Sequence, residues 1–201
     1  MRDILESQDR MQNEADEVVR LLRLDDLLGR LGTPVRVGSS AMGLMVARDI
    51  DITVVCRSLD DHTLRTFSGI AAELMQSTTV ASIRFRNETG TWNSEPEKYP
   101  DGLYLGLTVH DQTAAEWTLD IWAIAQPARQ PDLEHLRSLL PRLSQENRRT
   151  ILRLKHSLAE RPKEAKVVPS ILIYKAVVDH NVETMEQFDE WLEKNGSQGV
   201  L

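Results

Sequence analysis

Two aspartates, Asp49 and Asp51, stand one residue apart at the start of an apolar, β-branched segment that predicts a strand over residues 50–56. Successive strand residues face opposite sides of a sheet, so both carboxylates project from one face while Ile50 and Ile52 point into the core. Two adjacent carboxylates repel each other and are costly to desolvate, and a bound divalent cation offsets both penalties. Carboxylate oxygens are natural ligands for Mg²⁺, which commonly adds substrate phosphates and water. The pair therefore predicts a magnesium site, with Mn²⁺ as the alternative ion.

A glycine and a serine, Gly38 and Ser39, precede this pair. They follow a short apolar segment, residues 34–37, and we expect residues 40–45 to form a helical turn. A glycine at this point lets backbone amides approach a phosphate closely, and the N-terminus of a helix favours an anion. The Ser39 hydroxyl can donate one more hydrogen bond. The two residues therefore predict a phosphate-binding turn.

A third carboxylate, Asp120, lies inside the otherwise apolar segment 117–124, which is a predicted strand. An unpaired carboxylate on such a strand is expensive to bury. Asp120 lies 120 − 51 = 69 residues after Asp51, so the two side chains can meet only if their strands are neighbours in the sheet. Together the three acids could hold two metal ions close to each other.

The set of residues described so far resembles the signature of the nucleotidyltransferase superfamily, which includes DNA polymerase beta and the antibiotic nucleotidyltransferases. The residues are Gly38-Ser39, the Asp49-x-Asp51 pair and Asp120, in this order along the chain. That signature is a Gly-Ser pair, a short spacer, an Asp-x-Asp, and a distant third acid on a neighbouring strand. The resemblance implies that Gly38 and Ser39 grip the terminal phosphates of a nucleoside triphosphate.

The close match covers residues 35–55 and 118–122, and the order of the elements agrees in between. The resemblance implies that Asp49, Asp51 and Asp120 are catalytic residues and metal ligands. Asp120 would also help to deprotonate the acceptor hydroxyl. In the alternative interpretation, the first two are surface acids on an edge strand and the Gly-Ser pair is only a turn.

The chain departs from the family pattern in its basic residues. Residues 41–43 are Ala-Met-Gly, where the family often carries a basic residue, and Arg48 stands where a small hydroxyl residue is common. The best substitute is Lys155, at the margin of the apolar stripe of a predicted helix over 144–160, a place similar to that of phosphate-binding lysines in the superfamily. We therefore predict Arg48 and Lys155 as nucleotide-binding residues. The alternative for Lys155 is a lysine that only snorkels to solvent. Arg153 is expected on the opposite face of this helix, in solvent.

Periodicity and breaker residues divide the chain into elements. They predict helices over 18–28, 58–76, 133–140, 144–160, 170–179 and 184–195, and strands over 34–37, 50–56, 80–86, 103–109 and 117–124. Residues 87–101 are a long polar loop and residues 126–131 a linker. The fold class is therefore α+β: a mixed-sheet nucleotidyltransferase core with an N-terminal helix in residues 1–126, flanked by helices and followed by a helical C-terminal subdomain in residues 127–201.

Other residues with chemical potential have plainer interpretations. Tyr104 and Trp122, in predicted strands, are interpreted as core residues rather than base-stacking ones. His110 is interpreted as a turn residue rather than a catalytic one. The lone cysteine, Cys56, is expected to be a buried strand residue, and it excludes an internal disulfide and a cysteine-cluster metal site.

Charge and hydropathy limit the partners. With 41% hydrophobic and 27% charged residues, no membrane-length apolar run and an acidic N-terminus, the chain is expected to be cytoplasmic, with no membrane partner. The net charge of −7 opposes binding to extended nucleic acid. Residues 142–166 carry eight basic and three acidic residues, which suits a small anionic ligand, whereas residues 179–193 carry six acids and no Lys or Arg.

The sequence therefore predicts a metal-dependent nucleotidyltransferase. It would move a nucleoside monophosphate from a nucleoside triphosphate to the hydroxyl of a small-molecule acceptor, with release of pyrophosphate. The acidic segment 179–193 would suit a cationic acceptor, or is only a solvated face. One alternative is a protein-modifying (AMPylating) enzyme of a toxin–antitoxin-like pair, in which the surface that binds the partner would show as an exposed apolar patch. The other is a non-catalytic nucleotide-binding module, which the three intact carboxylates disfavour.

Overall fold

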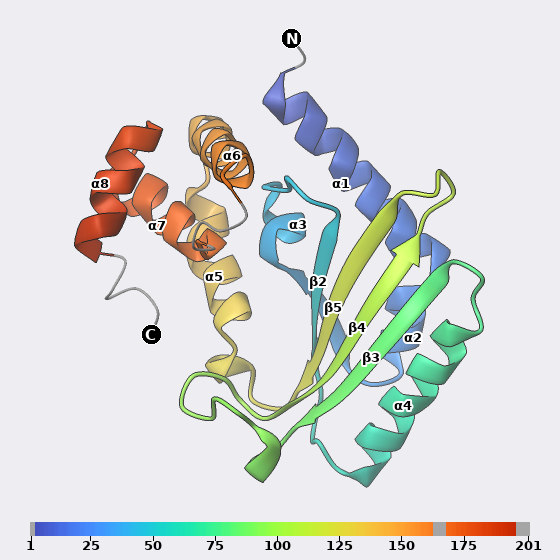
Figure 1. Cartoon of the computed structure of the whole chain (residues 1–201). Coiled ribbons are helices and arrows are strands. Elements are labelled where there is room, and N and C mark those ends of the chain that lie inside the picture. The colour runs from blue at the N-terminus through green and yellow to red at the C-terminus, as the bar shows by residue number, and fades with distance from the viewer. Residues whose placement is uncertain (1–2, 163–167, 196–201) are drawn as a thin grey trace.

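The computed structural model describes residues 3–162 and 168–195 as a five-stranded sheet with helices packed on both of its faces (Figure 1). The strands are β1 (Thr33–Val37), β2 (Asp49–Val55), β3 (Val80–Glu88), β4 (Gly102–His110) and β5 (Glu116–Ile124). The helices are α1 (Ile4–Leu21), α2 (Leu24–Gly29), α3 (Gly38–Met42), α4 (Asp61–Met75), α5 (Pro131–Leu139), α6 (Gln145–Ala159), α7 (Ser170–His180) and α8 (Met185–Asn195). The predicted α+β class is confirmed.

The order of strands in the sheet is β1-β2-β5-β4-β3. The sheet is mixed, because β2 and β5 run parallel while the other neighbouring pairs are antiparallel. β2 is therefore an inner strand with a partner on each side, and it is not the edge strand of the alternative interpretation. The parallel register places Asp51 beside Asp120 and Asp49 beside Thr118.

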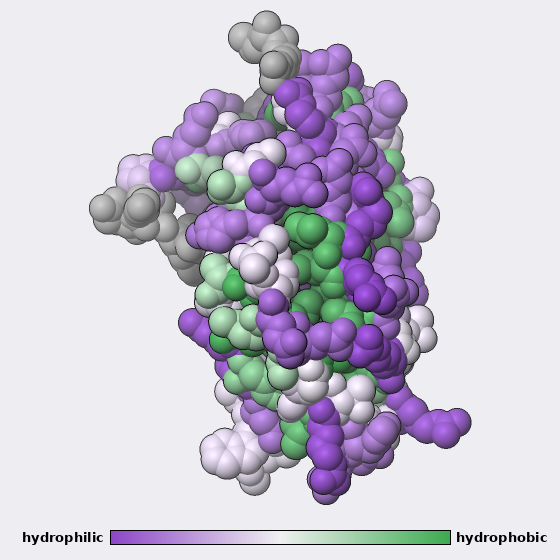
Figure 2. Space-filling view, turned by 90° about the vertical axis from the view of Figure 1, so that its right-hand side faces the viewer, coloured by the Kyte–Doolittle hydropathy of each residue, from purple (hydrophilic) through white to green (hydrophobic). Residues whose placement is uncertain are grey.

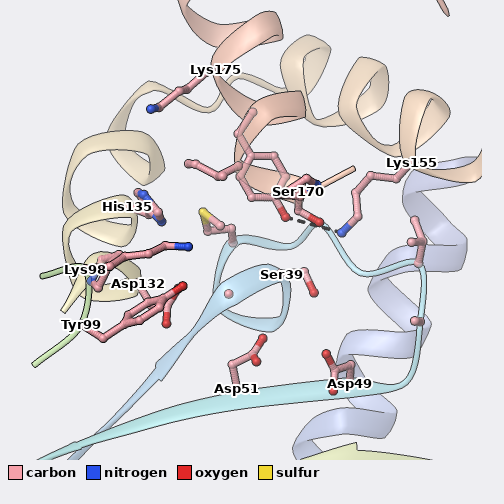
Figure 3. A pocket seen from close by; sticks show the side chains of 18 of the residues that line it. Ser39, Asp49, Asp51, Lys98, Tyr99, Asp132, His135, Lys155, Ser170 and Lys175 are labelled. Atoms are coloured by element: carbon pink, nitrogen blue, oxygen red, sulfur yellow. Dashed lines mark hydrogen bonds between the residues drawn. The ribbon is translucent and has the colours of Figure 1, made fainter. Parts of the chain in front are cut away.

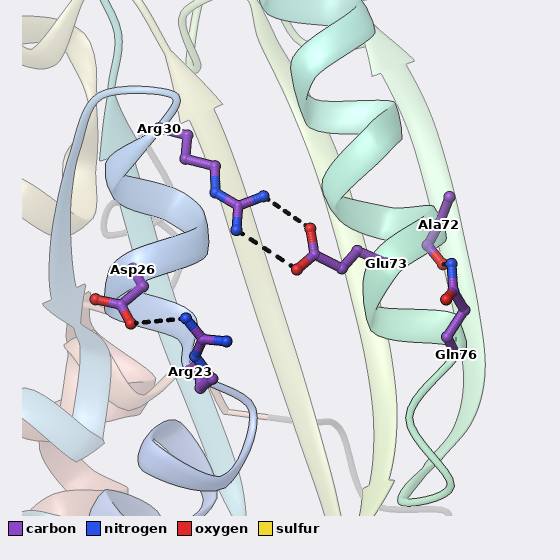
Figure 4. A network of polar contacts seen from close by, with 6 residues as sticks. All are labelled: Arg23, Asp26, Arg30, Ala72, Glu73 and Gln76. Carbon is purple, nitrogen blue, oxygen red and sulfur yellow. Dashed lines mark hydrogen bonds and ion pairs between the residues drawn. The ribbon is translucent and has the colours of Figure 1, made fainter.

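One face of the sheet forms the main hydrophobic core with α1, α2 and α4. Ile50, Ile52 and Val54 of β2 are buried here, against side chains such as Leu28 and Phe67. The alternation of β2 thus turns its aspartates to the opposite face. Figure 4 shows how the helical layer is joined at its surface, where the Arg30 guanidinium after α2 contacts both carboxylate oxygens of Glu73 on α4, at 2.7 and 3.5 Å.

On the other face, the C-terminal helices gather over α3 and the β1–β2 side of the sheet (Figure 1). A second apolar cluster joins them: Met42 and Leu44, in and after α3, pack with Ile151 of α6, Ile173 of α7 and Phe188 of α8. The predicted boundary at residue 126 stays a prediction. The same face of β3, β4 and β5 carries mostly half-buried and exposed side chains, except near the end of β5, where Ile124 is buried with Leu133 of α5.

Several local expectations change. The predicted N-terminal helix is two helices, broken at Arg23, which adopts the left-handed conformation with φ +52°. The acidic segment 179–193 is partly neutralised, because Asp179 pairs with Arg142 and Asp189 with Arg161. Lys163 and Lys166 of the basic segment lie outside the described residues. None of the helices in the described ranges is long and apolar enough to cross a membrane.

Candidate active site

The three predicted carboxylates lie on one face of two parallel strands. Asp49 and Asp51 alternate with buried residues along β2, and each is half-buried, as is Asp120 on β5. Asp49 accepts a hydrogen bond from the hydroxyl of Thr118, its register partner, at 2.5 Å. Asp120 accepts one from the hydroxyl of Tyr104 on β4. The register therefore confirms that Asp51 and Asp120 lie side by side on neighbouring strands, while the catalytic and metal-binding roles of the three acids stay predictions.

The Gly-Ser turn packs directly against one of these carboxylates. Gly38 begins the five-residue helix α3 with φ +63°, a conformation that side chains rarely adopt. A Cβ at this position would also clash with the Asp51 carboxylate. Because α3 is so short, what it offers an anion is mainly the N–H groups of its first turn. Ser40 turns its hydroxyl back to the Val37 carbonyl, whereas Ser39 lines the cavity beside Asp51 (Figure 3).

A cavity of about 890 Å³ opens above these residues. Figure 3 shows Asp49 and Asp51 projecting into it from β2 with Ser39 of α3 beside them, and Lys155 from α6 and Ser170 from α7 on its opposite side. The residues come from segments that span most of the chain, so the cavity exists only in the folded protein.

Lys155 supplies the buried cation of the cavity. Its ammonium donates to the Leu44 carbonyl at 2.7 Å and lies 3.5 Å from the Tyr174 hydroxyl, and the residue is only 9% exposed. Burial lowers its pKa to about 8, against the opposing effect of Asp51 and Asp49. The ammonium therefore stays largely protonated at neutral pH and faces the carboxylates. It does not snorkel to solvent, whereas Arg153 is exposed, as expected.

The carboxylates of β2 are held in a site that disfavours their charge. Burial, and then the charges of neighbouring acids with Asp49 foremost, raise the pKa of Asp51 to about 7. Burial also raises the pKa of Asp49, although its hydrogen bond from Thr118 opposes the change. Such a site gains from a positive charge, because a cation relieves both burial and repulsion.

The residues on the far wall of the cavity were not predicted from the sequence. It consists of Lys98 and Tyr99 from the 87–101 loop, Asp132 and His135 from α5, and Lys175 from α7 (Figure 3). Burial lowers the pKa of His135, against the charge of Asp132, which raises it, and with a smaller lowering effect of the charge of Lys175. The only signal in the sequence was the length of the polar loop, since long loops in compact domains are often functional.

Solved structures share this fold. A mutant of the Cid1 poly(U) polymerase bound to MgATP matches 89% of this chain and 52% of that chain, with a TM-score of 0.57 and 19% sequence identity. Cid1 bound to MgGTP matches 84% and 50% of the two chains, with a TM-score of 0.55 and 19% identity. Cid1 with the UTP analogue UMPNPP matches 84% and 48%, with a TM-score of 0.54 and 19% identity. The chain has the nucleotidyltransferase fold.

The chain spans about half the length of these Cid1 structures. No family model matches it, and no curated protein matches its sequence. At the identities found, the likeness establishes the nucleotidyltransferase fold, and the chemistry has to be argued from the side chains of this chain.

The donor set at the centre of this fold suits magnesium. Asp49, Asp51 and Asp120 supply carboxylate oxygens without sulfur or imidazole, which is the ligand type that Mg²⁺ prefers. Across the described residues, no three His, Cys, Asp or Glu side chains are already arranged as a metal cage. Asp49 and Asp120 each give one oxygen to a protein hydroxyl, Thr118 and Tyr104 respectively. Their other oxygens and Asp51 are the groups that would hold a cation.

Arg48 does not join the others. It is exposed, and its guanidinium pairs with Glu14 of α1 at 3.4 Å and lies over the Trp117 ring. Neither Arg48 nor Asp120 is among the residues that line the cavity, but Asp120 is paired with Asp51 in the sheet. The geometry gives no support to its predicted role in nucleotide binding. The interpretation of Tyr104 and Trp122 as core residues holds only in part, since both are half-buried on the sheet face that carries Asp120, and Trp122 packs against the apolar cluster of Val37, Ile124 and Leu133. Cys56 is buried, as expected.

Proposed function

We propose that the protein transfers a nucleoside monophosphate from a nucleoside triphosphate to the hydroxyl of a small-molecule acceptor and releases pyrophosphate. The observation that carries the proposal is the convergence of three carboxylates on one sheet face beside a Gly-Ser turn and a buried lysine. Without cations, the carboxylates would repel a triphosphate. Without the carboxylates, the Gly-Ser turn would bind a triphosphate but would not hold the metal ions that the reaction needs. The combination suits phosphoryl chemistry at the α-phosphate.

Different residues of the site contact different parts of the triphosphate. The first-turn amides of α3 and the Ser39 hydroxyl face its terminal phosphates, and Lys155 neutralises their charge from the opposite side of the cavity. Asp49 and Asp51 would hold Mg²⁺, or Mn²⁺, against the triphosphate, with Asp120 completing the set. When bound, the ions supply charge stabilisation for the attacking and leaving oxygens.

The acceptor approaches the α-phosphate from the β5 side. Its hydroxyl oxygen forms a bond to the α-phosphorus, the bond from that phosphorus to the bridging oxygen breaks, and pyrophosphate leaves. Asp120 accepts the hydroxyl proton, since its carboxylate lies beside Asp51 and is oriented by the Tyr104 hydroxyl. The parallel pairing of β2 and β5 therefore sets the distance between the donor side and the acceptor side.

The test is transfer of label from α-³²P-labelled nucleoside triphosphates to a panel of small-molecule alcohols, with Mg²⁺, with Mn²⁺ and with EDTA. We expect metal-dependent transfer by the wild type and a loss of roughly a hundredfold or more in Asp120→Asn. The matched control is Asp61→Asn, at the exposed start of α4. Equal transfer by Asp120→Asn and wild type would remove the proposed proton acceptor.

A protein acceptor is the second candidate. Figure 2 shows hydrophobic side chains gathered in a furrow on the face that carries α4 and the edge strand β3. Hydrophobics at the margin of the main core include the half-buried Met11, Ile83 and Phe85, and Met75 at the end of α4 is 52% exposed. Such a surface suits a partner protein. In the same assay, a protein acceptor would give label in protein and none in the small molecules.

A further inference from the structure

The sheet face that carries the aspartates continues past them. Paired residues of neighbouring strands point to the same side, so the register extends the face in rows across the sheet. One row is Asp51, Asp120, Gly106 and Arg84, and the next row is Thr53, Trp122, Tyr104 and Arg86. The aspartate row therefore lies beside a row that contains two aromatic rings and an arginine.

Those three side chains are in contact with one another. The Tyr104 and Trp122 rings have centroids 5.0 Å apart and are tilted by 50°. The Arg86 guanidinium lies 4.2 Å from the centroid of Tyr104 and 5.8 Å from that of Trp122. Arg84, one row nearer to Asp120, is also exposed. We call Arg84, Arg86, Tyr104 and Trp122 the aromatic–arginine platform.

The platform is joined to the active site by a hydrogen bond. The Tyr104 hydroxyl donates to Asp120, and it reaches across the place where a side chain at position 106 would stand. A Cβ on Gly106 would clash with that hydroxyl. Glycine at this position therefore lets one aromatic ring serve the platform and the third carboxylate together.

The position and charge of the platform indicate what it binds. Fully core aromatic pairs are buried, whereas both rings here are half-buried, although Trp122 also packs on the cluster that contains Ile124. Arg86, which lies over the rings and pairs with Glu88 at 3.5 Å, is exposed, and so is Arg84. Aromatic faces combined with arginine bind nucleobases by stacking and phosphates by charge. The protein as a whole carries a net charge of −7, and two arginines match the phosphate of one nucleotide better than a long polynucleotide.

We propose that the aromatic–arginine platform binds a nucleotide as the acceptor, with its base on the rings, its phosphate at Arg84 and Arg86, and a ribose hydroxyl beside Asp120. This inference rests on the proposed function and narrows its acceptor to a nucleotide. The same chemistry is offered by a free mononucleotide and by the last nucleotide of a short RNA. The platform thus holds the acceptor on β3–β5 while the triphosphate occupies the cavity beside α3.

Binding can be measured without turnover. The protein is first saturated with Mg²⁺ and a non-hydrolysable triphosphate analogue, and is then titrated by calorimetry with 5′-AMP or with an RNA hexamer of adenylates. We expect Arg84→Ala with Arg86→Ala, and separately Trp122→Leu, to weaken binding at least tenfold. Because both arginines are exposed, the double variant keeps the test valid if Trp122→Leu fails to fold.

Two exposed residues outside the platform supply matched controls. Arg65 on α4 and Trp92, which is 72% exposed in the 87–101 loop, are changed to Ala and Leu respectively and should bind like the wild type. Tight binding of 5′-AMP identifies a free nucleotide as the acceptor, and binding of the hexamer alone identifies an RNA end. If neither probe binds, or if platform and control variants behave alike, the proposal is overturned.

The two proposals fail in different ways. If the triphosphate analogue binds but neither acceptor probe does, the proposed role of the platform is refuted, while the proposed nucleotidyl transfer is not. Platform-dependent binding of a probe by a protein that binds no triphosphate and transfers no label removes the transfer reaction instead. In every platform variant, affinity for the triphosphate analogue should equal that of the wild type.

Discussion

Replacing Asp51 with asparagine removes a charge that folding forces against other carboxylates, at nearly constant shape. Burial and the neighbouring acids raise the pKa of Asp51 from 3.8 to about 7. A shift of this size corresponds to at most about 4 kcal/mol by which the ionised carboxylate disfavours the metal-free fold. We expect Asp51→Asn to recover about half, about 2 kcal/mol, because the neighbouring acids remain and the amide is itself polar.

The effect should depend on pH with a defined sign. Below about pH 4 the Asp51 carboxyl is protonated in the folded and the unfolded chain, so its replacement changes little. Between pH 4 and pH 7 the folded protein keeps a proton that the unfolded chain has released, so wild-type stability falls as the pH rises. The advantage of the variant therefore grows through this window and is complete above about pH 7.

The assay is thermal unfolding in EDTA from pH 4 to pH 8. At pH 8 the variant should melt about 4–8 °C above the wild type, given about 2–4 °C per kcal/mol for a chain of this size. Asp61→Asn, at an exposed ion pair on α4, should stay within about 0.5 kcal/mol of the wild type at every pH. A melting temperature of Asp51→Asn that equals the wild type at all pH values, or falls below it at pH 8, would refute the reasoning.

Three further changes probe the rest of the site. Calorimetry with ATP and GTP should show binding with Mg²⁺ or Mn²⁺ and at least tenfold weaker binding in EDTA, and equal affinities would exclude a metal-bridged site. Lys155→Met should weaken triphosphate binding at least tenfold while Arg153→Met on the exposed face of α6 should not, and identical behaviour would reduce Lys155 to a structural role. Gly38→Ala should lower both stability and transfer, because position 38 has a positive φ and the added Cβ would clash with Asp51. The control is Gly69→Ala, inside α4 with open space around it, which should stabilise the protein by up to about 1 kcal/mol. Wild-type stability and transfer in Gly38→Ala would contradict the close packing at the turn.

The sequence predicted the parts of the site that depend on short spacing. Asp49 and Asp51 share a face because strand residues alternate, and Gly38 marks a turn because few other residues tolerate its conformation. The apolar stripe of α6 was sufficient to predict that Lys155 lies on the inner side of the helix and Arg153 on the outer side, since both positions follow from the period of one helix. These features depend on residues close together in the chain, so short sequence patterns are sufficient to predict them.

The rest depends on contacts between distant segments. Tyr104 and Trp122 alternate with core residues like any strand aromatic, and no local pattern shows that they stay half-buried on the sheet face that carries Asp120. No local pattern identifies His135 or Lys175 as cavity residues, because α5 and α7 reach the cavity only through their packing on α3 and each other. Arg48 was chosen by its position next to Asp49, and its side chain turns to α1 instead.

The most direct test of nucleotidyl transfer at this site is a crystal structure with Mn²⁺ and a non-hydrolysable nucleoside triphosphate, read by anomalous scattering. We predict Mn²⁺ peaks between the carboxylates of Asp49 and Asp51 and the phosphates, with Ser39 and Lys155 in contact with the triphosphate. Crystals of Asp51→Asn should lose these peaks. Peaks away from these carboxylates in the wild type, or a triphosphate bound outside the cavity, would contradict the proposed active site.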